Sequence, residues 1–415
     1  MINYFDYIYP QPTGEHPFSI TAEATACTWA PEHQLVLIGL QGRELDKSKM
    51  PPNNLVFLVD VSGSMNSPDK LPLLQQSLNM LVEQMRPEDN IALVAYAGAP
   101  GLVLPSTSGS NKQKIKDAIN ALQSGGSTAG GAGIQLAYKV AQENFLKEGN
   151  NRIILCTDGD FNVGMSSDDE LIRLIEEKRK SGVFLSVLGF GTGNYQDAKM
   201  ENLADNGNGN FYYIDQLLEA QKVLVKEMGG TMFTIAKDVK IQVEFNPTKV
   251  ESYRLIGYEN RVMQAEDFNN DKKDAGELGS GHSVTALYEI IPAKSSKATK
   301  PESDLHFTQP TLTADAKTDQ LLWVKFRYKA PQDSVSKLIE KPLNARSIQA
   351  ANASENLRWA AAVAGFGMLL RNSKFKGDLS YDMVKSLAKD AIGKDEEGYR
   401  AEFLRIVKEA ELLKK

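Results

Sequence analysis

Between residues 54 and 230, short apolar runs alternate with amphipathic segments of helical length, and this alternation constrains the fold more than any other feature of the chain. The apolar runs lie at 55–59, 91–96, 153–156, 183–190 and, at an expected sheet edge, 211–214. The amphipathic segments lie at 71–85, 112–122, 134–145, 168–179 and 217–228. Strands that are apolar on both faces and alternate with helices belong to parallel sheets. The pattern therefore predicts an α/β domain with a doubly wound, mainly parallel sheet of Rossmann-like arrangement.

One strand of this sheet is expected to run antiparallel to the others. Two β-rich stretches flank a glycine- and proline-containing turn within residues 93–104. Such a turn between two β-rich stretches predicts a hairpin, and hence one antiparallel edge strand.

The pattern changes to a period of two after Thr234, at 239–245, 283–291 and 321–328. This period is typical of half-buried strands and predicts a β-sandwich. The first 50 residues contain one apolar patch, at 35–40, and are too few to bury a core alone, so their strands are expected to pack on the sandwich.

Helical spacing returns in the last part of the chain, at 357–370 and 398–413, which predicts C-terminal helices. A length of 415 residues also exceeds what one hydrophobic core normally serves. We therefore expect four parts, namely N-terminal strands at 1–50, the α/β domain at 51–232, the sandwich at 233–346 and a helical region at 347–415.

The overall composition excludes several classes of protein. With 42% hydrophobic and 24% charged residues the chain is typical of a globular protein. Its 47 basic residues are scattered and outnumbered by 53 acidic ones, which argues against nucleic acid as a partner. No run approaches the roughly 18 apolar residues of a membrane span. Cys27 and Cys156 are expected to be free thiols, and they do not fix the compartment.

Oxygen-bearing side chains follow two of the predicted strands, and another lies in a glycine-rich loop. The strand at 55–59 ends in Asp60, and Ser62 and Ser64 follow at intervals of two, so that their oxygens can converge in an extended loop. Thr128 lies in a glycine-rich loop before a helix, and Asp158 follows the strand at 153–156. Because the carboxyl ends of parallel strands meet at one edge, these five side chains are expected to converge.

Two carboxylates and three hydroxyls are hard oxygen donors. Such donors suit Mg²⁺, with Mn²⁺ or Ca²⁺ as alternatives, and they do not suit zinc. The sequence therefore predicts a divalent cation site at this sheet edge.

The residues Asp60, Ser62, Ser64, Thr128 and Asp158 resemble, in identity, order and spacing, the metal-ion-dependent adhesion site of the von Willebrand factor type A family. The resemblance covers about residues 52–232. It implies that the three hydroxyls are direct metal ligands and that the two aspartates bind directly or through water. It also implies that an acidic side chain of a protein partner takes the last coordination position.

Residues 3–7, 37–42, 157–164 and 256–261 resemble a bacterial subgroup of type A proteins that has a short N-terminal extension and a C-terminal domain of unknown function. This resemblance implies a bacterial origin and a place in the cell envelope, periplasmic or at the surface. No targeting signal is visible at the start of the chain. A protein from which a signal segment has been removed would likewise show no targeting signal. A cytoplasmic location also stays open.

The function that these observations predict is metal-dependent adhesion to the acidic group of a protein partner, without catalysis. One alternative is a scaffold with a purely structural metal. Another is a Mg²⁺-dependent phosphoryl-processing enzyme with Asp60 as nucleophile, but Ser62 stands where such an enzyme would carry its second carboxylate. A weaker cation candidate, at 267–278, lacks the glycine and the final glutamate of a calcium loop and is interpreted as a solvated acidic turn.

Overall fold

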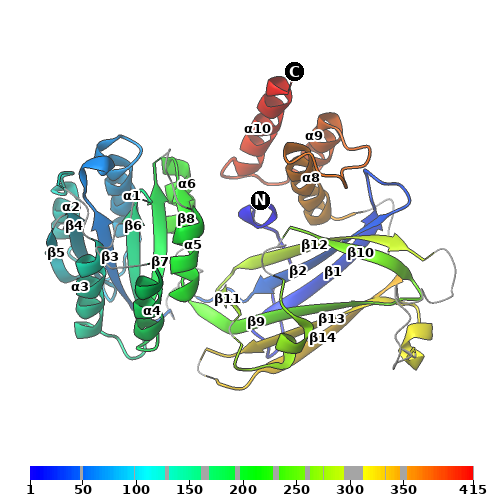
Figure 1. The fold of residues 1–415 in the computed structure, drawn as a ribbon, viewed down its shortest axis with the longest axis horizontal. Helices are drawn as coiled ribbons and strands as arrows, with labels where there is room; N and C mark the ends of the chain where they lie inside the picture. The colour runs from blue at the N-terminus through cyan, green and yellow to red at the C-terminus, as the bar shows by residue number, and fades with distance from the viewer. Residues whose placement is uncertain are drawn as a thin grey trace. The chain divides into compact units, whose positions relative to one another are not determined.

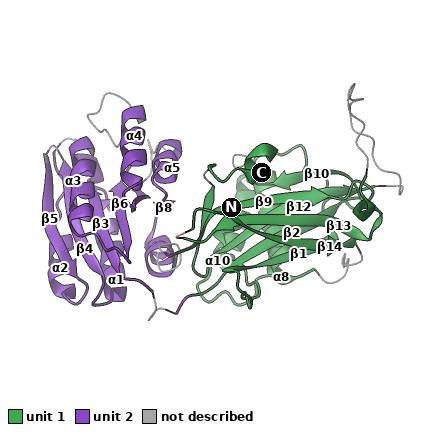
Figure 2. Ribbon diagram, turned by 90° about the horizontal axis from the view of Figure 1, so that it is seen from below, with its two compact units in different colours: residues 1–44, 234–415 green, residues 45–233 purple. Residues whose placement is uncertain are grey.

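The structure is a computed structural model. It describes residues 1–46, 50–97, 99–126, 130–159, 168–191, 197–227, 233–257, 262–273, 275–293, 312–331, 333–345 and 353–414. The chain forms two compact units (Figure 2), of which unit 1 comprises Met1–Glu44 and Thr234–Lys415 and unit 2 comprises Leu45–Phe233. Unit 2 is thus inserted into the chain of unit 1, and each unit is described separately below.

Unit 2 is built on one six-stranded sheet with the order β5-β4-β3-β6-β7-β8 (Figure 1). Its strands are β3 (Asn53–Asp60), β4 (Asn90–Ala97), β5 (Ala99–Ser108), β6 (Asn150–Thr157), β7 (Val183–Phe190) and β8 (Phe211–Ile214). All neighbouring pairs are parallel except β4 and β5, which form an antiparallel hairpin. The predicted doubly wound sheet with an antiparallel edge strand is therefore confirmed.

Helices cover both faces of this sheet. They are α1 (Leu71–Gln84), α2 (Lys112–Asn120), α3 (Gly130–Glu143), α4 (Asp168–Arg179), α5 (Asp197–Asn206) and α6 (Leu217–Gln221). Successive residues of β3 point to opposite faces, so that Phe57 packs in a core with α1, α2 and α6, and Leu58 packs in a core with α3, α4 and α5. Burial on both faces explains why β3 is apolar along its whole length.

The last helical segment of unit 2 differs from the prediction of one helix at 217–228. It consists of a short α6 followed by a π-helical stretch, η4 (Lys222–Glu227). Val223 and Leu224, in the π-helical stretch, are fully or almost fully buried against the sheet. Both side chains of this π-helical stretch therefore belong to the core.

Unit 1 contains two antiparallel four-stranded sheets, with the orders β1-β2-β12-β10 and β11-β9-β13-β14. Their strands are β1 (Phe18–Ala26), β2 (Gln34–Gly42), β9 (Thr234–Phe245), β10 (Val250–Ile256), β11 (Gly276–Gly279), β12 (Ser283–Pro292), β13 (Gln320–Lys329) and β14 (Lys337–Asn344). The ring of Phe18 in the first sheet lies 6.0 Å from that of Phe326 in the second, centroid to centroid. The predicted β-sandwich is thus formed, and the N-terminal strands are hydrogen-bonded members of it.

Three C-terminal helices, α8 (Glu355–Leu370), α9 (Tyr381–Lys389) and α10 (Tyr399–Leu413), pack on the outer face of the first sheet. Leu35 and Leu37 of β2 point toward these helices, and the intervening Val36 is also fully buried. Phe5, in the N-terminal segment, packs edge-to-face on Trp359 of α8. Within the described part of the chain, no helix combines the length and the apolar character needed to cross a lipid bilayer.

Candidate metal centre

The two predicted aspartates lie at the carboxyl edge of the unit 2 sheet. Asp60 is the last residue of β3, and Asp158 directly follows β6. These strands are parallel neighbours, and Val59 pairs with Cys156, so the two carboxylates leave the sheet side by side. The chain proceeds from β3 to β4 on one side, whereas β6 lies on the other, so the strand order changes direction here. Doubly wound folds bind their ligands at such a point.

The loop after β3 turns its hydroxyl groups toward one another. The N–H of Ser62 donates to Oδ1 of Asp60 at 2.8 Å, which folds the loop back on the strand end. The Oγ atoms of Ser62 and Ser64 are 3.0 Å apart. Ser62 is buried, whereas Ser64, in the 3-10 turn η3 (Gly63–Asn66), is exposed. The two hydroxyls therefore form a pair that is open to solvent at one end.

The glycine-rich loop is tied to the same turn through its main chain. The N–H of Gly125 donates to the carbonyl of Val61 at 2.7 Å, and the N–H of Gly63 donates to the carbonyl of Gly126 at 3.2 Å. Gly126 has a φ of +87°, a conformation that a side chain would disfavour. Thr128 lies outside the described residues, so its predicted role as a ligand stays a prediction.

Burial and like charge both act on the Asp60 carboxyl. Desolvation raises its pKa above the usual range, and repulsion by Asp158 raises it further. Hydrogen bonds from Ser62 and from the hydroxyl of Tyr96, which donates to Oδ2 at 3.2 Å, act in the opposite direction. The site therefore holds two carboxylates whose charge is only partly balanced, an arrangement that favours a bound cation.

Two further residues belong to this centre and were not singled out from the sequence. Tyr96, near the end of β4, is fully buried, and its pattern in the sequence is that of an ordinary core aromatic. Lys70, which directly precedes α1, donates from Nζ to Oδ2 of Asp158 at 2.8 Å and to the carbonyl of Ser64 at 3.0 Å. The signal that could have pointed to Lys70 is its position, six residues after Ser64 at the start of a helix.

The donor set is compatible with a hard divalent cation. The side-chain atoms described at this edge that could bind a cation are the oxygens of Asp60, Ser62, Ser64 and Asp158, because the nitrogen of Lys70 is an ammonium without a free lone pair. In the described ranges of the whole chain, no group of three or more His, Cys, Asp or Glu side chains is placed to hold a metal. A metal here would therefore depend on hydroxyl ligands in addition to the two carboxylates.

Comparison with known proteins identifies the family of the chain. Residues 54–227 match the family model described as von Willebrand factor type A domain, residues 230–413 match that of the C-terminal part of the uncharacterized protein YfbK, and residues 1–37 match one described as von Willebrand factor. The uncharacterized protein YfbK of Escherichia coli strain K12 is 44% identical over 395 residues, which cover 95% of this chain and 68% of that protein. The chain belongs to the YfbK family. Type A domains such as the one in this YfbK-family chain generally mediate protein–protein interaction and are generally not enzymes.

Other similar proteins are less identical to this YfbK-family chain. A UPF0353 protein of Mycobacterium sp. strain KMS is 31% identical over 173 residues, which cover 38% of this chain and 50% of that protein. A solved structure titled von Willebrand factor type A from Catenulispora acidiphila is 15% identical, with a TM-score of 0.48 and coverage of 94% of this chain and 90% of that one. That score is too low to carry an argument about function.

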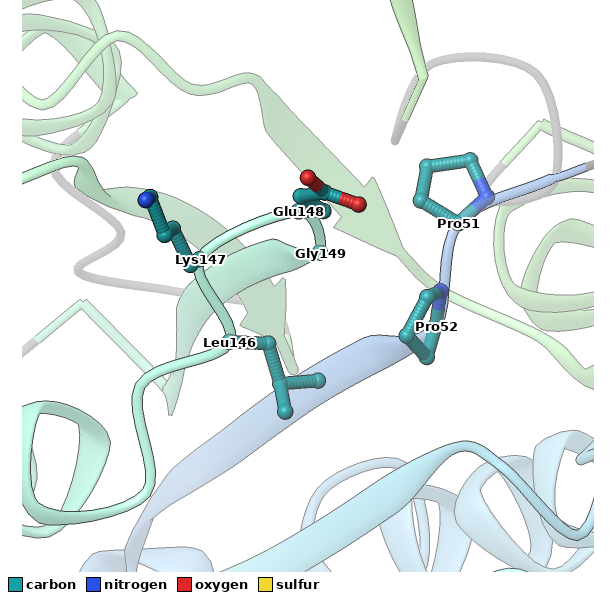
Figure 3. A pocket seen from close by; sticks show the side chains of 6 residues that line it. All are labelled: Pro51, Pro52, Leu146, Lys147, Glu148 and Gly149. Atoms are coloured by element: carbon teal, nitrogen blue, oxygen red, sulfur yellow. The ribbon is translucent and has the colours of Figure 1, made fainter.

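The YfbK-family chain also has a hollow of about 460 Å³, whose lining residues are drawn in Figure 3. It is lined by Pro51, Pro52, Leu146, Lys147, Glu148 and Gly149. Pro52 directly precedes β3 and Gly149 directly precedes β6, so the hollow lies at the amino edge of the sheet. Ligands of doubly wound sheets bind at the opposite, carboxyl edge, where Asp60 and Asp158 lie.

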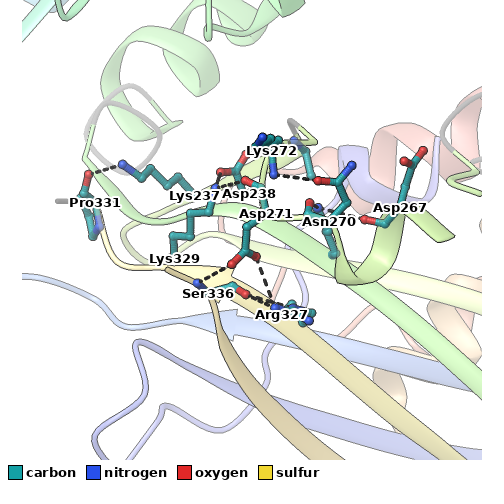
Figure 4. Close-up of polar contacts among 12 residues, drawn as sticks. Lys237, Asp238, Asp267, Asn270, Asp271, Lys272, Arg327, Lys329, Pro331 and Ser336 are labelled. Carbon is teal, nitrogen blue, oxygen red and sulfur yellow. Dashed lines mark hydrogen bonds and ion pairs between the residues drawn. The ribbon is translucent and has the colours of Figure 1, made fainter. Parts of the chain in front are cut away.

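The calcium-like loop near residue 270 is held by basic side chains of unit 1 (Figure 4). Nζ of Lys240 donates to the carbonyl oxygens of Asp267 and Asn270, at 3.1 and 2.5 Å, and Nζ of Lys329 donates to that of Asp271 at 2.6 Å. A calcium loop would use side-chain oxygens at its first, third and fifth positions, and Arg327 donates to two of these, Oδ1 of Asn269 at 2.8 Å and Oδ1 of Asp271 at 3.3 Å. The interpretation as a turn agrees with these contacts, although the turn is fixed to the sheet by lysines and not merely solvated.

Proposed function

We propose that this chain is a protein-binding module that recognises an acidic group of its partner through a divalent cation. The cation, Mg²⁺ in preference to Mn²⁺ or Ca²⁺, would be held by the hydroxyls of Ser62, Ser64 and Thr128 and, directly or through water, by the carboxylates of Asp60 and Asp158. When bound, it supplies a positive charge that can accept a carboxylate oxygen from outside the chain.

The observation that supports this proposal most strongly is the convergence of Asp60 and Asp158 on one edge beside a paired set of serine hydroxyls. The hydroxyl of Ser64 lies at the exposed end of this pair, so an external carboxylate can approach from that side. Two carboxylates and neutral hydroxyls leave a divalent ion less neutralised than a cage of carboxylates would. That deficit favours an anionic partner group.

The alternative of a phosphoryl-processing enzyme is disfavoured by the surroundings of Asp60. Its side chain is fully buried, and its two oxygens accept hydrogen bonds from Ser62 and Tyr96. A nucleophilic carboxylate needs an accessible oxygen and a nearby acid or base. We therefore propose that the chain is not an enzyme. Mg²⁺-dependent turnover of a phosphoester by the purified protein, lost in Asp60→Asn, would contradict this.

The test of metal binding is calorimetric titration of the purified chain with Mg²⁺, Mn²⁺ and Ca²⁺. Ser62→Ala should weaken binding by at least about tenfold, or roughly 1.4 kcal/mol, because it removes one ligand. Ser67→Ala is the matched control, because this serine lies just beyond the loop and donates to Asp69 instead. Equal affinity of Ser62→Ala and the natural chain for these ions would contradict the proposed site.

The test of partner binding is a pull-down from a bacterial envelope extract, with and without chelator. Partners should be lost with chelator and with Ser62→Ala, and kept with Ser67→Ala. Recovery of the same partners in every arm, from a chain that still binds Mg²⁺ in solution, would favour the scaffold with a structural metal.

We also propose a place in the bacterial cell envelope, on the resemblance of several sequence segments to envelope proteins of the type A family. Fractionation of cells that make the natural full-length protein tests this directly. Recovery of the protein in the cytoplasmic fraction alone would overturn the assignment.

A further inference from the structure

The side chain of Lys70 points into the candidate metal centre instead of into solvent. Its side chain is 17% exposed, and that of its partner Asp158 is 4% exposed. For comparison, the side chain of Lys139, on α3 of the same unit, is 70% exposed, and its ion pair with Glu143 has a distance of 3.9 Å. Lys70 therefore makes the shorter and more buried ion pair of the two, at 2.8 Å.

The main chain and the aliphatic stem of Lys70 are both held in place. Its N–H donates to the carbonyl of Ser67 at 3.0 Å, and its carbonyl accepts from the N–H of Leu74 at 2.8 Å. The stem passes over Gly191, directly after β7, where an added Cβ would lie 2.3 Å from Cε and 2.7 Å from Cγ of Lys70. A side chain at position 191 would thus fill the space that the stem uses. The glycine there, with a φ of +82°, keeps this path open.

The ammonium of Lys70 contacts the groups that a divalent ion would also use. Nζ donates to Oδ2 of Asp158, a predicted metal ligand, and to the carbonyl of Ser64, whose hydroxyl is another predicted ligand. With Lys70 present, the carboxylates of Asp60 and Asp158 together with the ammonium carry one net negative charge. Without Lys70 they would carry two. The attraction for a cation falls accordingly.

We propose that Lys70 is a built-in competitor of the divalent ion, which neutralises Asp158 when the site holds no metal and thereby lowers the affinity of the site for metal. This inference rests on the proposed function, because it assumes that Asp158 binds the ion. Binding of the ion replaces the single positive charge of the ammonium at Asp158 by the two positive charges of a divalent cation. Lys70 therefore sets the concentration of free cation at which the site becomes loaded and ready for an acidic partner.

The test compares Mg²⁺ affinity by calorimetry in Lys70→Met, Lys70→Gln and the control Lys139→Met. Both substitutions at position 70 should tighten Mg²⁺ binding by at least about tenfold. Lys139→Met removes the same charge from an exposed position and should leave the dissociation constant within about twofold of the natural value. The use of two neutral side chains at position 70 separates the effect of charge from the effect of side-chain shape, and circular dichroism verifies that each variant is folded.

Thermal melting gives a second readout that does not depend on the affinity measurement. In chelator, the midpoint of unit 2 unfolding should fall in Lys70→Met, because Asp158 loses its counter-charge, and saturating Mg²⁺ should restore it. The midpoint shift on adding Mg²⁺ should therefore be larger in the variant than in the natural chain.

The outcomes distinguish this inference from the function on which it rests. If both position-70 variants bind Mg²⁺ as the natural chain does, or more weakly, the proposed role of Lys70 is wrong. If Ser62→Ala still loses Mg²⁺ binding in that case, the proposed metal site is supported. No divalent ion binding by the natural chain or by any position-70 variant would overturn both.

Discussion

Replacement of Tyr96 by phenylalanine tests how the buried carboxylate of Asp60 is stabilised. The phenol hydroxyl donates to Oδ2 of Asp60 at 3.2 Å, and it also forms a hydrogen bond with the side chain of Thr157. A hydrogen bond to a charged group contributes about 1.5–3 kcal/mol and one between neutral groups about 1 kcal/mol. Because 3.2 Å is long for a bond between two oxygens, we expect the lower half of the first range. Unit 2 should therefore lose roughly 2.5–3 kcal/mol near pH 7 without metal.

The loss in Tyr96→Phe should depend on pH in a defined direction. The pKa of Asp60 is already raised by burial and by Asp158, and removal of the Tyr96 hydrogen bond raises it further. A carboxyl with a raised folded-state pKa loses stability as the pH rises through that pKa. The destabilisation should therefore be about 2 kcal/mol in acid, where Asp60 is neutral and both lost hydrogen bonds join neutral groups, and grow to its full value toward neutral pH.

The assay must report on unit 2 alone. All three tryptophans, Trp29, Trp323 and Trp359, belong to unit 1, so their fluorescence does not follow unfolding of unit 2. Hydrogen exchange of peptides from β3 and β4, in chelator and at several pH values, measures the relevant opening free energy.

The matched control for this assay is Tyr138→Phe. Tyr138 is equally buried in the same unit, and among the described residues its hydroxyl has no hydrogen-bond partner. Its removal should be neutral or slightly stabilising. Equal losses in the two variants, or a loss in Tyr96→Phe that does not change with pH, would refute the assigned role of the Tyr96 hydroxyl.

Three further changes test other features. In chelator at pH 7, Asp60→Asn should stabilise unit 2, because it removes a buried charge next to Asp158, and this gain in hydrogen-exchange protection should vanish in acid. Gly209→Ala should cost about 2–3 kcal/mol in the same assay, because the new Cβ would lie 1.8 Å from a main-chain oxygen of β7, whereas Gly101→Ala, with open space around it, should cost little. Arg400→Met should destabilise unit 1 by about 2–4 kcal/mol, seen by tryptophan fluorescence, because this buried guanidinium donates to one carboxylate and two carbonyl groups.

The sequence predicts the α/β sheet well because its strands are buried on both faces. The run at 183–190 and the helix at 168–179 coincide with β7 and α4 to the residue. Two strands at sheet edges, β10 and β14, were not predicted, because much of their length is exposed. β10 is largely exposed along its middle, and β14 is exposed at most positions and contains Pro342, so neither shows a clear alternation. The short helices α5 and α9 were not predicted either, although α2, which is of similar length and buries no more residues, was.

The aspartates and serines of the candidate site were predictable from strand ends, because the edge of a parallel sheet brings together residues that are far apart in the chain. Lys70 was not predictable in this way. Its contact with Asp158 depends on the start of α1 and on the absence of a side chain at Gly191. The role of Tyr96 was not predictable from the sequence either, because only the folded structure reveals that its hydroxyl faces Asp60. Pairwise contacts of this kind leave no periodic signal along the chain.

The insertion of unit 2 into the chain of unit 1 has a consequence for synthesis on the ribosome. Gln41 of β2 pairs with Ser283 of β12, about 240 residues later. At about 5–20 residues per second, this partner strand emerges roughly 12–50 s after β2. A hairpin of β1 and β2 alone is marginally stable, and β2 is apolar on both faces, so it remains exposed to aggregation during this interval. The type A domain, in contrast, is formed by one continuous stretch of chain. It can therefore fold before β12 is synthesised and pairs with β2.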